Sequence, residues 1–217
     1  MAVTYYITAR HQLDSLPGPG EREEGLIRKV RAAFSAGVDY VQVREKDLPA
    51  GRVADLVETL AGLPEKRNCR LLVNERWDIA GSCGADGVHL PSDSSLLPLI
   101  RARAGESIIL GVSCHGKEDV ARAAGEGASY VLLGPIFETP SKPGVKPLGL
   151  ATLSEICRSF RVHIYALGGI NARNAEDCIG AGAAGVAGIR LFQQEQDIEA
   201  LCRRLSFLEN KDWRVND

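Results

Sequence analysis

Three residues that can bind an anion alternate at the end of one apolar stretch. Gln42, Arg44 and Lys46 in VQVREK lie two positions apart, and residues two apart share one face of a β-strand. An amide and two cations would then point the same way. Because a desolvated cation needs an anionic partner, the pattern predicts a bound phosphate or diphosphate. The alternative is a surface ion pair with Glu45 or Asp47.

A second set of anion-binding groups lies in the segment GPIFETPSKPG. It contains Thr139, Ser141 and Lys142, with Pro140 and Pro143 restricting the backbone around them. Such a loop would hold hydroxyl and ammonium groups ready for an anion. A plain solvated loop is the alternative.

Glycines follow two further apolar runs near the end of the chain. LGGIN contains Gly168 and Gly169, and AGIRLF contains Ile189 and Arg190. Many (β/α)₈ barrels bind phosphate through the loops after strands seven and eight, where backbone N–H groups face the anion. The two turns together therefore predict a phosphate site that includes Arg190.

Oxygen ligands for a metal ion occur at two other strand ends. Asn74 and Glu75 end VNER, and Asp93 follows HLPS. Mg²⁺ usually takes one or two carboxylates and leaves its other positions to water and substrate phosphate, so these residues predict a magnesium site. Asp93 has a helix N-cap as its alternative role. Ser113 ends GVS and joins the candidate binding residues, whereas His89 is expected to be structural.

Apolar, β-branched runs alternate with segments of helical period along the whole chain, which is typical of parallel strands joined by helices. AGVDYVQV, CGADGVHL, EGASYVLL and AGAAGVAGI repeat one helix-end, glycine and strand pattern. We therefore predict one domain over residues 1–217, an α/β protein with a single (β/α)₈ TIM barrel, in preference to an open Rossmann-like sheet. The predicted strands are 5–8, 40–44, 70–74, 87–90, 108–113, 130–134, 163–167 and 185–189.

The composition excludes several functional classes. The 217 residues carry 26 basic and 28 acidic side chains with no basic stripe, which argues against a nucleic-acid partner. No apolar run is long enough to span a membrane, and six widely spaced cysteines indicate reduced thiols. We expect a cytoplasmic protein that acts on small molecules. The sequence does not fix the oligomeric state, and a homo-oligomer is one alternative.

The segments VQVREKDL, LLVNERWDIA, GADGVHL, ILGVSCHG, YVLLGPIFETPSKPG and YALGGINARNAEDCIGAGAAGVAGI occur in one order over nearly the whole chain. In this the chain resembles the thiamine phosphate synthase family, including its thiazole tautomerase branch. The resemblance implies an enzyme that joins a hydroxymethylpyrimidine diphosphate to a thiazole phosphate and releases diphosphate. It implies binding of the pyrimidine diphosphate by Gln42, Arg44, Lys46, Asn74, Ser113 and Lys142, and of the thiazole phosphate by Thr139, Ser141, Gly169, Ile189 and Arg190.

The chain departs from the family pattern at its metal site and between its branches. The synthases carry Asn-Asp where this chain has Asn74-Glu75, and an Asp where it has Ser94. We expect a shifted Mg²⁺ site of Glu75 and Asp93. The tautomerase branch uses a His at the position of Pro135, so an isomerase with a substitute acid or base, His115 or Glu75, is the second hypothesis. A non-catalytic phosphate-ligand sensor is the third.

Overall fold

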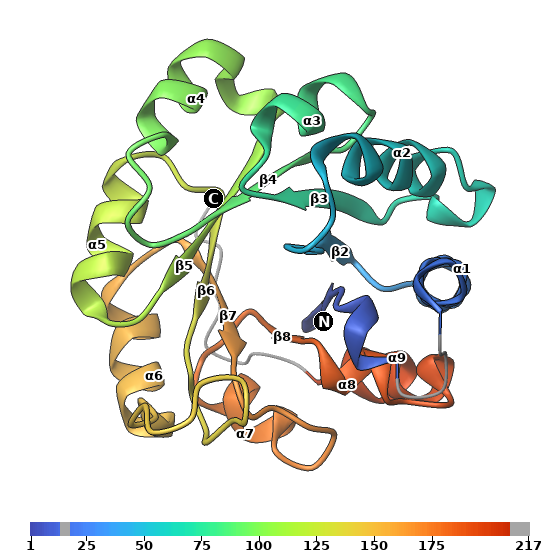
Figure 1. Ribbon diagram of the computed structural model, residues 1–217. Helices are drawn as coiled ribbons and strands as arrows, with labels where there is room; N and C mark the ends of the chain where they lie inside the picture. The colour runs from blue at the N-terminus through green and yellow to red at the C-terminus, as the bar shows by residue number, and fades with distance from the viewer. Residues whose placement is uncertain (14–17, 209–217) are drawn as a thin grey trace.

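The computed structural model describes residues 1–13 and 18–208. In this part of the chain eight parallel strands close into a barrel in chain order, with β1 paired to both β2 and β8. The predicted (β/α)₈ barrel is therefore confirmed (Figure 1). The strands are β1 Val3–Ile7, β2 Tyr40–Val43, β3 Arg70–Asn74, β4 Gly87–Leu90, β5 Ile109–Cys114, β6 Tyr130–Leu133, β7 His163–Leu167 and β8 Gly185–Gly188.

Helices lie outside the ring of strands and cover its outer face (Figure 1). The α-helices are α1 Pro19–Ser35, α2 Ala50–Ala61, α3 Trp77–Ser82, α4 Leu97–Ala104, α5 Lys117–Gly125, α6 Gly149–Ser159, α7 Ala175–Gly180, α8 Arg190–Gln193 and α9 Ile198–Ser206. Three short 3₁₀ turns are η1 Arg10–Gln12, η2 Pro64–Lys66 and η3 Gly105–Ser107. The connection between β3 and β4 holds only the six-residue α3.

The bounds of two helices depend on local features that an apolar pattern does not indicate. α1 begins at Pro19, where Gly18 N–H donates to the Glu21 side chain at 3.3 Å. A proline at the first helical position suits a helix start because its missing N–H has no partner there. The four-residue α8 after β8 was not predicted, since a segment so short has no readable period.

The barrel interior is aromatic and partly polar, although aromatic residues are only 6% of the chain. Tyr5, Tyr130 and Tyr165 are almost completely buried there, and Tyr5 stacks on Tyr40 with ring centroids 5.5 Å apart. Gly111 makes this possible, because a Cβ on that residue would lie 2.0 Å from Cζ of Tyr130. The larger apolar core lies between the strands and the helices.

Two further features concern the cysteines and the helix lengths. All six thiols are free, and all but Cys157 are buried. In the described ranges, no helix combines the length and the apolar character that a membrane span requires.

Candidate functional site

A cavity of about 900 Å³ opens where the strands end at their carboxyl termini. This volume lies within the range of small-molecule sites, and the carboxyl end of the strands is where (β/α)₈ barrels place their active sites. Most of the predicted site residues line it: Gln42, Arg44, Ser113, Thr139, Ser141, Lys142, Gly168, Gly169, Ile189 and Arg190.

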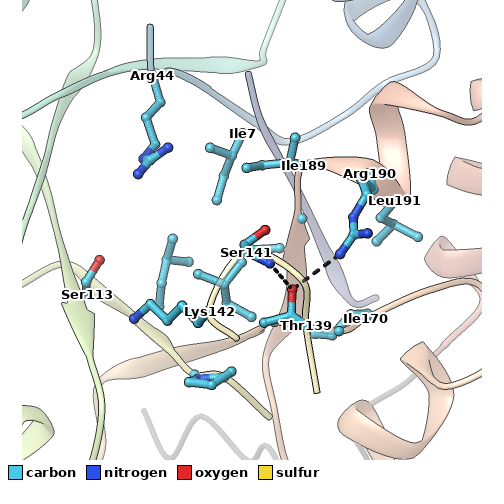
Figure 2. A pocket seen from close by; sticks show the side chains of 18 of the residues that line it. Ile7, Arg44, Ser113, Thr139, Ser141, Lys142, Ile170, Ile189, Arg190 and Leu191 are labelled. Atoms are coloured by element: carbon cyan, nitrogen blue, oxygen red, sulfur yellow. Dashed lines mark hydrogen bonds between the residues drawn. The ribbon is translucent and has the colours of Figure 1, made fainter. Parts of the chain in front are cut away.

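Three cationic side chains from different loops reach this cavity. Arg44 follows β2, Lys142 lies in the loop after β6, and Arg190 begins α8. Figure 2 shows Arg44 and Lys142 directed toward the same space as Ser113, with Arg190 bonded to Thr139 on the other side. Among the residues described, none of the three forms an ion pair with a carboxylate, although Glu138 and Glu195 also line the cavity.

The electrostatics around Lys142 reflect this crowding of positive charge. Partial burial, together with the charge of Arg44, lowers the pKa of the Lys142 ammonium. Its Nζ lies 3.4 Å from Nε2 of His115, whose Nδ1 lies 2.7 Å from the carbonyl of Gly134. Because a carbonyl only accepts, His115 donates to it from Nδ1, and the neutral ring would present Nε2 as an acceptor to Lys142.

Contacts between the loops after β6, β7 and β8 fix their positions around the cavity. The Arg190 guanidinium donates to Oγ1 of Thr139 at 3.3 Å, and Ser141 N–H donates to the same oxygen at 3.4 Å (Figure 2). Gly168 and Gly169 have φ of +95° and +68°, and a Cβ on Gly169 would lie 2.4 Å from the carbonyl oxygen of Glu138. The double glycine thus lets the two loops pack directly on each other.

Lys46 does not line the cavity with Gln42 and Arg44, and β2 ends at Val43, so strand alternation does not extend to Lys46. Its exposed ammonium instead lies 3.3 Å from Oε1 of Glu75, and neither side chain lines the cavity. Glu75 has a φ of +64°, a left-handed conformation that turns the chain sharply after β3. The geometric reason for placing Lys46 in the barrel mouth was therefore wrong.

The alternative ion pairs expected for the VQVREK segment also differ from those observed. Arg10 forms ion pairs with both carboxylates: its guanidinium nitrogen lies 3.3 Å from Oε2 of buried Glu45 and 2.6 Å from Oδ1 of Asp47. Glu45 also accepts from the Thr8 hydroxyl at 2.6 Å. These contacts leave Arg44 directed at the cavity, and sequence reasoning missed Arg10 because it lies 35 residues from Glu45.

The predicted metal ligands have other contacts or lie exposed in the structure. Oε1 of Glu75 is held by Lys46 and by Nδ2 of Asn74, the latter at 2.9 Å. Asp93 is exposed, and it does not cap α4, whose N-cap is Leu96. Within residues 1–13 and 18–208, no group of three or more His, Cys, Asp and Glu is placed to hold a metal ion. As arranged, these donors do not fit a resident Mg²⁺.

Two histidines near the cavity are the residues that the prediction undervalued. Both histidines line the cavity: His115 lies beside Lys142, and His89 is almost completely buried, with Nε2 2.9 Å from Oγ of Ser113. Burial and the nearby charge of Arg44 lower the pKa of His89 to about 3, so its ring is neutral. The polar residue in the apolar run GVHL was the available signal for His89.

A parallel eight-stranded barrel with a cationic cavity at the carboxyl ends of its strands defines a (β/α)₈-barrel protein with a site for a small molecule. Comparison with known protein families shows to which family the chain belongs. The model of the family described as "Thiamine monophosphate synthase" matches residues 5–192. This chain belongs to that family.

Individual relatives agree with this assignment. The chain is 38% identical over 202 residues to a putative thiamine-phosphate synthase of Geobacter sulfurreducens, covering 93% of this chain and 91% of the relative. It is 39% identical over 204 residues to a thiamine-phosphate synthase of Roseiflexus castenholzii, covering 94% and 86%. Among solved structures, the thiamine phosphate pyrophosphorylase of Pyrococcus furiosus superposes with a TM-score of 0.78 at 26% identity, covering 94% and 93%.

Proposed function

We propose that this protein is a thiamine-phosphate synthase, a transferase that condenses hydroxymethylpyrimidine diphosphate with thiazole phosphate and releases diphosphate. The observation that carries the proposal is the cavity itself. In a member of this family, Arg44, Lys142 and Arg190 reach one cavity without carboxylate partners among the described residues. Such cations suit two phosphorylated substrates.

The proposed reaction breaks one bond and forms one bond. The C–O bond between the pyrimidine methylene and the diphosphate breaks, the electron pair leaves with diphosphate, and a pyrimidine carbocation remains. The thiazole nitrogen then donates its lone pair to that methylene carbon. Arg44 and Lys142 would stabilise the charge that develops on the departing diphosphate, which is the main contribution a preorganised site can make.

The other groups would hold the substrates in line for this transfer. We assign the thiazole phosphate to Thr139, Ser141, Gly169, Ile189 and Arg190, and the pyrimidine end to Gln42, Asn74 and Ser113. Positioning of two reactants in this way converts a bimolecular step into an effectively unimolecular one. For Lys46 to bind the diphosphate as predicted, its ammonium has to leave the Glu75 carboxylate.

Magnesium stays a prediction, and no step above depends on it. Glu75 is already paired with Lys46 and Asn74, so an ion there would have to arrive with the diphosphate and displace Lys46. Asp93 would have to supply the second carboxylate.

One observation supports the isomerase as a second candidate. His115 lines the cavity and uses Nδ1 for the carbonyl of Gly134, so its Nε2 is the nitrogen that would accept a substrate proton as a general base. Proton exchange into a carboxythiazole phosphate, followed by NMR, tests this candidate.

Incubation of the protein with both substrates and Mg²⁺ tests the synthase, with thiamine phosphate detected by fluorescence. We expect product from the wild type and from Arg103→Gln, an exposed control on α4, and a strong loss in Arg44→Gln. No thiamine phosphate would refute the synthase. Tight binding of thiamine phosphate with neither reaction would favour the non-catalytic sensor.

Two further predictions accompany the proposed function. A cytoplasmic location is supported by the six free thiols, which suit a reducing compartment. Homo-oligomer formation stays a prediction that sedimentation would test.

A further inference from the structure

A continuous chain of hydrogen bonds crosses the barrel from its outer rim to the cavity. It starts at the carboxylate of Glu75 and ends at the hydroxyl of Ser113. The successive donor–acceptor distances are Asn74 to Glu75 2.9 Å, Gln42 to Asn74 2.9 Å, Tyr5 to Gln42 3.1 Å, Tyr5 to Tyr130 2.8 Å, Tyr130 to His89 3.0 Å and His89 to Ser113 2.9 Å. The members come from six strands or strand ends, β1 to β6, and no water is needed to link them.

The Glu75 carboxylate determines which group donates and which accepts in the first half of this chain of hydrogen bonds. Glu75 receives the Lys46 ammonium on the same oxygen, Oε1, that faces Asn74, so Asn74 must donate its amide N–H there. The Asn74 carbonyl oxygen then accepts from Nε2 of Gln42. That leaves the Gln42 carbonyl oxygen as the acceptor for the Tyr5 hydroxyl.

The second half follows because each hydroxyl has one proton. The Tyr5 hydroxyl already donates its proton to Gln42. The 2.8 Å contact between the two tyrosine oxygens therefore requires the Tyr130 hydroxyl to donate to Tyr5. Tyr130 must in turn accept from His89, which places the single proton of that neutral ring on Nδ1. Nε2 of His89 is then an acceptor, and among the described residues the Ser113 hydroxyl is the group placed to donate to it.

The opposite tautomer of His89, with its proton on Nε2, is disfavoured because the two tyrosines have only one hydroxyl proton each. With its proton on Nε2, His89 would need the Tyr130 proton at Nδ1, and the two tyrosine oxygens would meet at 2.8 Å with no proton between them. Tyr5, Tyr130 and His89 are all at least 97% buried, so no solvent could relieve that contact. Burial lowers the pKa of His89 to about 3, which excludes the doubly protonated ring near neutral pH.

We propose that Ser113 faces the cavity as a hydrogen-bond acceptor, and that His89 and Tyr130 are positioning residues that hold its hydroxyl proton away from the ligand. An acceptor of this kind binds a ligand N–H. It forms no hydrogen bond with an ionised phosphate oxygen, which has no proton to donate. The chemical class it takes is an exocyclic amino group on a heteroaromatic ring. For a pyrimidine diphosphate this assigns Ser113 to the aminopyrimidine ring and leaves the diphosphate to the cations, an assignment that rests on the proposed function.

The tautomer of His89 tests the hydrogen-bond direction without any substrate. Two-dimensional long-range ¹H–¹⁵N NMR of the wild-type protein distinguishes the two ring nitrogens of a buried histidine. We expect Nδ1 to carry the proton and Nε2 to be bare at neutral pH. A proton on Nε2 would overturn the proposal whether or not the protein proves to be a synthase. Tyr5→Phe, which removes the hydroxyl that commits Tyr130, is expected to relax this preference.

A substrate analogue tests the recognition itself. Replacing the amino group of the pyrimidine diphosphate by hydrogen should raise KM at least tenfold in the wild type and in the conservative control Ser113→Thr, which keeps a hydroxyl. The same replacement should change KM less than threefold in Ser113→Ala. An equal penalty in Ser113→Ala and the wild type would overturn the proposal.

If turnover is absent, binding of the free aminopyrimidine alcohol and its desamino analogue by calorimetry gives the same comparison. A tenfold preference for the amino compound that is lost in Ser113→Ala would support the acceptor role while the synthase assignment fails. Equal binding of both compounds by the wild type would refute the acceptor role.

Discussion

Truncation of Lys142 to alanine is the most direct test of the cationic cavity. Its ammonium is partly exposed, and the partner it has among the described residues is His115, at 3.4 Å. Removing it therefore leaves no buried carboxylate unpaired, and the fold should be unaffected. Lys146 provides a matched control, since it is an exposed lysine of the same loop that does not line the cavity.

The magnitude follows from one charge interaction. Two unit charges about 4 Å apart interact by about 1 kcal/mol in water and by about 4 kcal/mol at the effective dielectric constant near a protein surface. Because Lys142 is exposed on one side, the lower part of this range applies. We expect at least about 1.4 kcal/mol of lost transition-state stabilisation, which is tenfold in rate.

Steady-state kinetics with both substrates measures this loss as kcat/KM. Lys142→Ala should reduce it at least tenfold, whereas Lys146→Ala should stay within twofold of the wild type. Equal values for Lys142→Ala and the wild type would show that the ammonium does not meet the diphosphate, and the charge argument would fail.

The pH dependence gives an independent check on the same group. Partial burial and the Arg44 charge lower the pKa of Lys142 below its ordinary value of 10.5. Since only the protonated amine is charged, kcat/KM should fall as pH rises through this lowered pKa. Lys142→Arg keeps its charge at higher pH, so its alkaline limb should move upward. An unmoved limb would assign the titration to another group.

Three further outcomes follow from the structure. Gly111→Ala should lower the free energy of unfolding by about 1–3 kcal/mol in urea, because its Cβ would overlap Tyr130, while Gly51→Ala in open space should not. His89 stays neutral in the fold down to a pKa of about 3, so stability should fall as pH drops below the ordinary value of 6.5, by up to about 1.4 kcal/mol per pH unit, and His89→Phe should lose this slope. If Mg²⁺ binds, calorimetry should show binding only with diphosphate present, and Glu75→Gln should abolish it; binding that survives Glu75→Gln would exclude this carboxylate as a ligand.

The strands and most cavity residues could be predicted because local periodicity determines them. Arg44 and Ser113 were found as polar residues that follow or end apolar runs, and parallel strands bring such ends to one rim. Lys46 lies outside the cavity lining for a local reason, since alternation cannot reveal where a strand stops. The left-handed turn at Glu75 likewise leaves no signature in an alternating pattern.

The chain of hydrogen bonds from Glu75 to Ser113 could not be predicted from one sequence. His89 and Tyr130 lie 41 residues apart, and Tyr5 and Tyr130 lie 125 apart. Their contact depends on the register of neighbouring strands, such as Gly111 opposite Tyr130 in β5 and β6. A glycine at that position looks like a weak strand residue until the ring that occupies its space is known.

The cations that surround the cavity also affect how the ligand-free protein should be handled. Arg44 and Lys142 repel each other when nothing lies between them, so part of the folding free energy opposes that repulsion. Any multivalent anion that binds only the folded state raises apparent stability by mass action. A melting temperature measured in phosphate buffer would then exceed the one measured in a zwitterionic buffer of equal ionic strength. Comparisons among variants of this site therefore require one fixed, anion-poor buffer.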